Sequence, residues 1–297
     1  MKVVVAGGTG FLGAPLVGRL MNEGHEVRVL SRRARAPHDI PWTPDGTAGP
    51  WASALDDADA VINLAGESIA SGRWTSARKA RIRDSRILAT RSLVAAMERS
   101  TRRPAVFLSG SAVGYYGPHG DEPVTEQTRP GDDFLAAVCR AWEAEALRAA
   151  GPTRVVLLRT GIVLAREGGA LPQMALPFRL FAGGPVGSGR QYQPWIHRND
   201  WITMTAWALR TPAVTGPLNV TAPNPVTNRE FARSLGQALG RPAFMPAPGF
   251  ALRVALGEMA DALLLTGARV IPAHAQAMGF HFEFPTLEPA LHSIYKT

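Results

Sequence analysis

The sequence predicts an α/β fold, with a doubly wound parallel sheet and a smaller C-terminal substrate domain. Two observations lead to this prediction. Strand-like and helix-like segments alternate through the first half of the 297-residue chain, which is typical of a parallel sheet with helices on both faces. Beyond about residue 165 glycine and proline become frequent, which indicates loops and short strands. We expect a first domain at 1–165, joined by parts of 195–222, and a second at 166–297.

Each element of the first domain follows from its apolar pattern. Short apolar runs, several of them β-branched, predict strands, and apolar residues three to four apart predict helices. The expected strands are 2–7, 25–32, 59–66, 104–117 (running into a loop) and 153–164. The expected helices are 11–23, 73–86, 86–100 and 132–150, the last capped by Asp132 or Asp133. In the second domain we expect loops and short strands at 167–174 and 181–195, and helices at 228–243 and 289–295.

Composition limits the classes of function. The chain has one cysteine, Cys139, so we expect no disulfide framework and no metal cluster. No secretory signal or membrane-spanning run is evident, and we expect a cytoplasmic monomer or homodimer. The net charge of +8 comes from scattered basic residues, which favours solvated helix faces over a nucleic-acid surface. A third interpretation is local attraction for a phosphorylated ligand.

A glycine-rich turn follows the first strand. Gly7, Gly10 and Gly13 are spaced G-x-x-G-x-x-G between a strand and a helix, the context in which this motif is informative. The first glycine permits the tight turn, the second lets backbone amides approach a pyrophosphate, and the third allows helix–strand packing. The helix N-terminus favours an anion. The sequence therefore predicts a Rossmann dinucleotide site, with contacts from Gly7, Thr9, Gly10, Phe11, Leu12 and Gly13.

The second strand indicates which dinucleotide binds. An acidic residue about 20 positions after the turn would hold a ribose 2′-hydroxyl and favour NAD. The chain instead has Ser31, Arg32 and Arg33 there. Guanidinium groups can bind a 2′-phosphate through charge-assisted hydrogen bonds. We therefore predict NADP(H) as the cofactor, although either arginine could simply be an exposed loop residue.

The third strand ends in a second cofactor segment. Leu64, Ala65 and Gly66 are small or apolar residues that let the backbone approach a cofactor ribose. Glu67 follows at the carboxyl end of a strand, where open α/β sheets bind ligands. We expect its carboxylate to face the substrate or the cofactor amide, or alternatively to cap a helix.

These segments resemble a known family. The matching pieces are "GGTGFLG", "NLAG", "FLSGSAVGYYG" and "WIHRND". They are similar to extended short-chain dehydrogenases/reductases of the NAD(P)-dependent epimerase/dehydratase superfamily. The segments 64–94, 139–146 and 216–243 more narrowly resemble the YfcH-like epimerase family. The resemblance spans essentially the whole chain, and it implies a Rossmann domain with a smaller domain over the nicotinamide end, but no particular substrate.

The resemblance also implies a catalytic pair that this sequence lacks. The superfamily uses Tyr-x-x-x-Lys on the helix after the serine strand, where tyrosine moves a proton and lysine holds the ribose. Aligning Glu143 with the glutamate that follows the lysine places Leu135 and Cys139 at the two positions. Leucine has no proton to transfer, and we expect Cys139 to be a buried hydrophobe. Proton transfer contributes about 100- to 10,000-fold to a rate.

Other residues are candidates for the chemistry. Ser109 and Ser111 could polarise a carbonyl group, and Tyr115 could serve as the acid, while Tyr116 is expected to pack in the loop. His197 is expected at the domain junction with Asp200 as its partner. Arg190 and Gln191, on a glycine-rich loop, could bind substrate. The favoured function is an NADP-dependent oxidoreductase or epimerase-like enzyme acting on a small molecule, and the alternative is a non-catalytic NADPH-binding regulator or scaffold.

Overall fold

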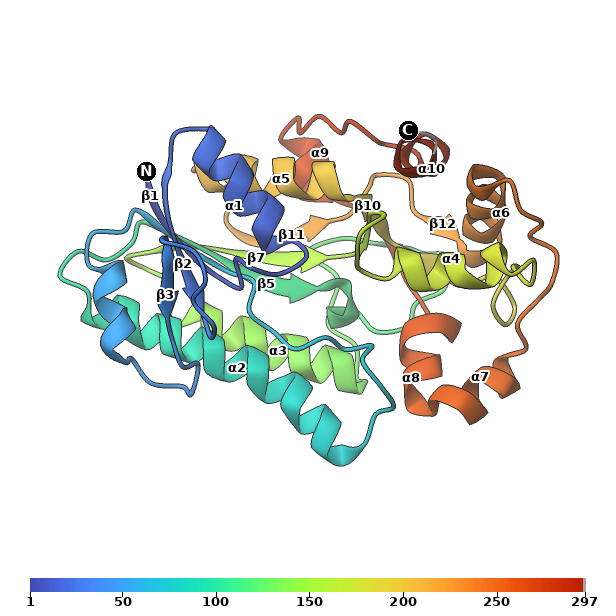
Figure 1. The fold of residues 1–297 in the computed structure, drawn as a ribbon, viewed down its shortest axis with the longest axis horizontal. Coiled ribbons are helices and arrows are strands. Elements are labelled where there is room, and N and C mark those ends of the chain that lie inside the picture. The colour runs from blue at the N-terminus through green and yellow to red at the C-terminus, as the bar shows by residue number, and fades with distance from the viewer. Residues whose placement is uncertain (296–297) are drawn as a thin grey trace.

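Helices cover both faces of one central sheet (Figure 1). The computed structural model describes residues 1–295. The sheet strands are β1 (Lys2–Ala6), β2 (Glu26–Ser31), β3 (Asp39–Pro41), β4 (Ala60–Asn63), β5 (Val106–Ala112), β7 (Arg154–Thr160) and β11 (Gly216–Val220). Within the described residues they form a seven-stranded parallel sheet in the order β11-β7-β5-β4-β1-β2-β3. The chain winds outward from β1 in both directions, which confirms the predicted doubly wound sheet.

Alternate residues of β1 face two separate hydrophobic layers. Val3 and Val5 pack on one face against α1 (Gly13–Asn22) and α5 (Arg198–Arg210), with α9 (Ala273–Ala277) nearby. Val4 packs on the other face, in a layer that includes side chains of α2 (Ser76–Arg99), α3 (Phe134–Leu147) and the 3₁₀ helix η1 (Pro50–Leu55). Figure 1 shows α2 and α3 side by side beneath the sheet. Both faces of the sheet are therefore covered, as all-parallel sheets require.

The remaining elements gather beyond the carboxyl ends of β5 and β7 (Figure 1). The helices are α4 (Leu171–Arg179), α6 (Asn228–Leu239), α7 (Gly249–Leu256), α8 (Glu258–Ala260) and α10 (Leu287–Tyr295), with the 3₁₀ turn η2 (Val113–Tyr115) and the π-helical turn η3 (Asp261–Leu265). The short strands are β6 (Pro123–Val124), β8 (Ile162–Leu164), β9 (Tyr192–Gln193), β10 (Trp195–His197), β12 (Val226–Thr227) and β13 (Arg269–Val270). α4, α6 and α10 share their own apolar core.

Most helices and strands predicted from local sequence in the first half of the chain are present in the structure. Asp133 caps α3 by accepting a hydrogen bond from the Ala136 amide at 2.8 Å. The two helical segments expected at 73–86 and 86–100 form one helix, α2, which Thr75 caps. Nothing in this stretch breaks the backbone pattern, so the helix continues through both segments.

Two predicted elements differ in part from the structure. The strand expected at 153–164 is divided at Gly161, where a Cβ would meet the carbonyl oxygen of Pro194, and β8 then pairs with β10 outside the main sheet. The loop expected at 167–174 contains the start of α4. Proline is tolerated in the first turn of a helix, where its missing N–H is not needed, and α4 buries Leu171 and Phe178.

Candidate active site

The glycine turn between β1 and α1 fits closely against its surroundings at both ends. Gly7 has φ +79°, and a Cβ on it would lie 2.7 Å from the backbone of Leu64. A Cβ on Gly13 would overlap the carbonyl oxygen of Gly7. Gly10 is different, because it is exposed and the nearest atom to its Cβ position is 3.3 Å away. The absence of side chains at Gly7 and Gly13 thus allows the close backbone packing of the turn. The absence of a side chain at Gly10 leaves the outer side of the turn open.

The open side of this turn presents unpaired donors. Within residues 1–295 the backbone amides of Phe11 and Leu12 make no hydrogen bond, as expected for the first N–H groups at a helix start. Thr9 is exposed, and the Phe11 ring packs against Gly168 and Gly169 of the loop after β8. Free amides, an exposed glycine and a helix N-terminus together fit a bound pyrophosphate.

The end of β2 carries two available guanidinium groups. Arg32 and Arg33 are exposed, and neither side chain has an ion pair or hydrogen bond with the part of the chain that the structure describes. The Ser31 hydroxyl accepts from the Arg33 amide at 3.2 Å and donates to the Arg33 carbonyl at 2.9 Å. Ser31 therefore shapes the turn from which both arginines project, a geometry that fits a phosphate.

Glu67 lies in the segment that follows β4, and its side chain already has partners. Its carboxylate binds the guanidinium of Arg78 and lies 3.7 Å from that of Arg81. Its backbone amide donates to the Ser85 hydroxyl at 3.1 Å. The capping alternative for Glu67 is wrong, because α2 begins at Ser76 under the Thr75 cap.

Ser111 belongs to a buried polar network. Its hydroxyl donates to Glu143 Oε1 at 2.6 Å, and Arg159 binds both oxygens of the same carboxylate at 2.8 Å. The Glu143 and Arg159 side chains are only 7% and 4% exposed. Ser111 consequently offers lone pairs rather than a proton to a ligand as it stands. Ser109 is fully buried, which leaves Ser111 as the serine nearer to the surface.

Tyr115, the last residue of η2, and Tyr116, which follows it, differ in burial and in hydrogen bonding. Tyr116 is fully buried, donates to Asn219 Oδ1 at 2.6 Å and accepts from Arg159 at 3.0 Å. Burial raises the pKa of Tyr116 to about 12, against the opposing charge of Arg159. Tyr115 is half-buried with its ring 3.5 Å from the Arg159 guanidinium, and its hydroxyl has no hydrogen-bond partner within the described residues. Tyr115 is therefore the tyrosine whose hydroxyl is available.

Arg190 and Gln191 lie on the loop before β9. Arg190 is exposed. The side-chain amide of Gln191 donates to the carbonyls of Val186 and Leu264, at 3.0 and 2.7 Å. The amide nitrogen of Gln191 thus holds this loop against η3, and substrate binding by either residue stays a prediction.

His197 does not pair with Asp200 as predicted. The Asp200 carboxylate accepts from the amides of Glu283 and Phe284 at 2.8 and 2.9 Å. His197 Nδ1 instead accepts from the Asn199 amide at 3.2 Å, and its ring packs 4.1 Å from that of Phe284. The predicted pair fails because distant backbone donors satisfy the carboxylate, and both residues fix the start of α5 to the C-terminal segment.

The protonation of His197 gives a testable pH dependence. Burial lowers the pKa of His197 to about 4, and the charge of Arg198 adds to the effect. As the pH falls, His197 is protonated in the unfolded chain near pH 6.5 but in the folded protein only near pH 4. The folded protein therefore loses stability as the pH falls from about 6.5 to about 4. In the wild type, His197 should account for a loss of about 2–3 kcal/mol in unfolding free energy between pH 7 and pH 4.5. His197→Gln should lack this part of the loss, and urea unfolding at the two pH values measures it. The exposed His292→Gln is the control, and equal pH profiles for His197→Gln and wild type would refute the prediction.

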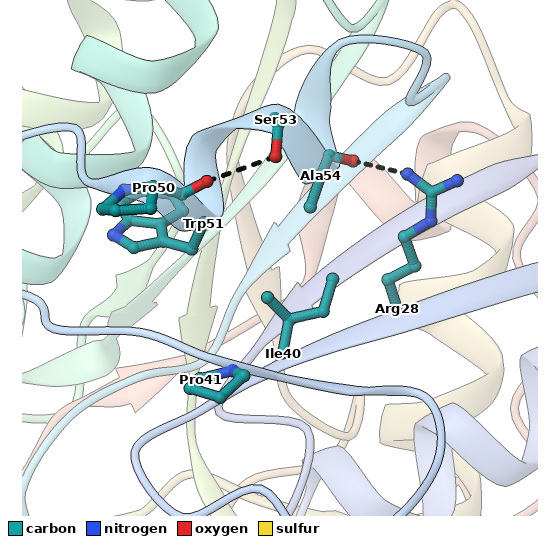
Figure 2. A pocket seen from close by; sticks show the side chains of 7 residues that line it. All are labelled: Arg28, Ile40, Pro41, Pro50, Trp51, Ser53 and Ala54. Atoms are coloured by element: carbon teal, nitrogen blue, oxygen red, sulfur yellow. Dashed lines mark hydrogen bonds between the residues drawn. The ribbon is translucent and has the colours of Figure 1, made fainter.

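An open pocket of about 480 Å³ lies elsewhere, at the β2–β3 edge of the sheet (Figure 2). Its lining residues are Arg28, Ile40, Pro41, Pro50, Trp51, Ser53 and Ala54. Arg28 donates to the Ala54 carbonyl at 3.1 Å and also pairs with Asp57, whereas the buried Trp51 Nε1 has no hydrogen-bond partner within the described residues. None of the residues predicted for the site lines this pocket, and we assign it no role.

Residues 1–295 contain neither a candidate metal centre nor a candidate membrane-spanning helix. No group of three or more histidine, cysteine, aspartate or glutamate side chains in this range is placed to hold a metal ion. No helix within the same residues combines the length and apolar character that crossing a bilayer requires.

Comparison with known proteins decides the family. The model of the NAD dependent epimerase/dehydratase family matches residues 3–220, and a domain of unknown function (DUF1731) matches residues 247–294. The chain belongs to the NAD-dependent epimerase/dehydratase family. The chloroplastic SDR39U1 homolog of Arabidopsis thaliana, also an epimerase family protein, is 41% identical over 99% of this chain and 86% of its own.

Two solved structures extend the match to three dimensions. The crystal structure of the human epimerase family protein SDR39U1 (isoform 2) with NADPH has a TM-score of 0.92 and 39% identity, and covers 100% of this chain and 99% of that one. The nucleoside-diphosphate sugar epimerase of Corynebacterium glutamicum has a TM-score of 0.82 and 33% identity, over 100% of this chain and 58% of that one. The predicted resemblance to the epimerase/dehydratase superfamily is confirmed.

Leu135 and Cys139, which the resemblance aligns with the family's tyrosine and lysine, are both apolar side chains. Leu135 packs against an apolar cluster of Trp74, Ile82 and Met259, the last of which is in α8. Cys139 is buried, with Sγ 3.8 Å from the Ala112 carbonyl, and burial raises its pKa to about 12. A thiol with that pKa is protonated at neutral pH and is a poor nucleophile or base. Cys139 therefore behaves as the small buried hydrophobe that the sequence predicted.

Sequence reasoning missed several residues that this family member places beside the candidate site. Arg159 lies under Tyr115, Glu126 accepts from the Asn219 amide at 3.0 Å, and Asn219 receives the Tyr116 hydroxyl. The available signal was a charged residue, Arg159, in the middle of the strand predicted at 153–164. A buried charge needs a partner, and that requirement could have suggested Glu143 on the neighbouring helix.

Proposed function

We propose that this chain binds NADP(H) and acts as an oxidoreductase or epimerase-like enzyme on a small molecule. The observation that carries the proposal is the glycine turn with its unpaired amides, with Arg32 and Arg33 free at the end of β2. The presence of NADPH in the crystal structure of the human relative supports it. When bound, the cofactor would supply or accept a hydride.

We further propose that residues 1–165, with parts of 195–222, hold the cofactor and that residues 166–297 form a smaller substrate domain. The pairing of β11 with β7 supports this division, because it returns residues 216–220 to the sheet. A cytoplasmic location and a monomeric or homodimeric state stay predictions, and the Arabidopsis relative is described as chloroplastic.

Tyr115 is the candidate proton donor of the proposed enzyme. Its hydroxyl is available and its ring rests on the Arg159 cation. Ser111, held by Glu143 at 2.6 Å, would accept a hydrogen bond from a substrate hydroxyl. Polarisation of a carbonyl by Ser111 would require its proton to turn away from Glu143.

A specific observation favours a second function, a non-catalytic NADPH-binding regulator or scaffold. Neither Leu135 nor Cys139 can replace the proton-transfer pair, because one lacks an acidic group and the other is buried and protonated. A chain without that pair would keep cofactor binding and lose turnover. The two functions therefore share the cofactor site and differ in chemistry.

The cofactor prediction is tested by calorimetric titration of Arg32→Ala and Arg33→Ala. We expect NADPH to bind about 10- to 100-fold more weakly, since each variant removes charge-assisted hydrogen bonds of about 1.5–3 kcal/mol, while NADH affinity stays unchanged. Arg35→Ala, an exposed arginine of the same loop, is the matched control. NADH binding to the wild type as tightly as NADPH would contradict the role of these arginines.

Turnover separates the two functions. A screen of small carbonyl and hydroxyl compounds, followed by NADPH absorbance, is expected to find activity that Tyr115→Phe lowers about 100-fold or more. Tyr192→Phe, in β9, is the control. Activity retained in Tyr115→Phe would clear Tyr115 of the role, and a chain that binds NADPH but turns over nothing would favour the regulator.

A further inference from the structure

The face of α3 that lacks the family's lysine is occupied by a cation from another helix. Cys139 and Trp142 lie three residues apart on α3 and therefore on one face. The guanidinium of Arg86, from α2, lies over the Trp142 ring with its central carbon 5.4 Å from the ring centre. α2 and α3 run side by side in Figure 1, which is how a side chain of one reaches the other.

Arg86 is positioned by the end of β4. Its Nη1 donates to the carbonyls of Glu67 and Ile82, at 3.0 and 2.9 Å. A Cβ on Gly66 would lie 3.3 Å from both Cγ and Cζ of Arg86. Glycine at position 66 thus lets the guanidinium lie directly under the predicted ribose-binding segment.

Charge and burial agree with this placement. Burial lowers the pKa of Arg86, and the neighbouring Cys139 and Glu67 oppose that change. Arginine stays protonated even so. The charge of Arg86 also opposes the rise that burial causes in the pKa of Cys139. A positive charge is therefore held beside position 139 although the residue there carries none.

The remaining donors of Arg86 are free. Its Nε and Nη2 make no hydrogen bond within residues 1–295. Donors of this kind bind hydroxyl or phosphate oxygens. We propose that Arg86 binds the nicotinamide-ribose half of NADP(H), an inference that rests on the proposed function. Arg86, on α2, would thus take the place of the lysine that α3 lacks.

The order of strands distinguishes the two halves of the cofactor. Arg32 and Arg33 follow β2, on one side of the β1 glycine turn, and Arg86 lies by β4 and β5, on the other side. A dinucleotide whose pyrophosphate lies on the glycine turn extends to both sides of β1. With the 2′-phosphate end near β2, the nicotinamide ribose falls on the side of Arg86.

The test compares two ligands that differ in this half. NADPH contains the nicotinamide ribose, and adenosine 2′,5′-bisphosphate does not. We expect Arg86→Met to weaken NADPH binding about 10- to 100-fold and to leave adenosine 2′,5′-bisphosphate binding unchanged, both measured by calorimetry. Arg86→Lys keeps the charge but not the fork of donors, and it should fall between wild type and Arg86→Met. Arg83→Met, on the same helix and paired with Asp84 at the surface, is the matched control.

Each outcome has a defined meaning. Unchanged NADPH affinity in Arg86→Met would overturn the inference and leave the proposed function intact. Equal weakening of both ligands would also overturn it, because Arg86 would then act on the adenosine half or on the fold. Wild-type protein that binds neither ligand would refute the proposed function itself.

Discussion

Gly13→Ala is expected to destabilise the protein by about 2–3 kcal/mol, a typical cost of overpacking. The Cβ would overlap the carbonyl oxygen of Gly7, and backbone atoms at both ends of the turn leave no room for relaxation. Because Gly7 itself touches the backbone after β4 at Leu64, movement of the turn would disturb two parallel strands. Thermal or urea unfolding monitored by circular dichroism measures the effect.

Two other glycines serve as controls for this variant. Gly18 lies on the exposed side of α1, with no atom within 4 Å of its Cβ position. Gly18→Ala should raise stability by up to about 1 kcal/mol, the difference in helix propensity. Gly10→Ala should leave stability nearly unchanged but weaken NADPH binding, since it obstructs only the open side of the turn. Similar stability for Gly13→Ala and Gly18→Ala would contradict the packing argument.

The glycine turn could be predicted from sequence because its causes are local. Strand, turn and helix lie within Lys2–Asn22, and each glycine acts on atoms a few residues away or on the adjacent β4. The strand at 2–7 could be predicted for the same reason, from its run of apolar residues. The same is true of the Asp133 cap, whose partner is three residues along the chain.

The polar network could not be predicted in the same way. Tyr116, Glu143, Arg159 and Asn219 are up to about a hundred residues apart in sequence, and only the packing of β5, β7, β11 and α3 brings them together. The same limit explains His197 and Asp200. They are near in sequence, but backbone amides 83 and 84 residues beyond Asp200 satisfied its carboxylate first. Sequence spacing identifies candidates for pairing and does not identify competing donors.

Arg159→Met is expected to have the largest effect on stability, about 3–5 kcal/mol, since removing one partner of a buried ion pair leaves the other charge uncompensated. Glu143 would keep only the Ser111 hydroxyl at 2.6 Å, and Tyr116 would lose a donor at 3.0 Å. The Tyr115 ring would lose its cation as well. Urea unfolding of the variant measures the cost, and loss of the support beneath Tyr115 should also lower any turnover.

A double-mutant cycle separates the ion pair from its surroundings. Replacing both partners, as Glu143→Leu with Arg159→Met, removes the unpaired charge, so the double variant should cost less than Arg159→Met alone. A residual loss of about 1–3 kcal/mol is expected because Ser111 and Tyr116 lose hydrogen-bond partners. The control is Arg91→Met, which breaks an ion pair with Glu145 from a side chain that is 43% exposed, and it should cost less than about 1 kcal/mol. If Arg159→Met cost no more than Arg91→Met, the buried network could not be what holds Ser111 and Tyr115 in place.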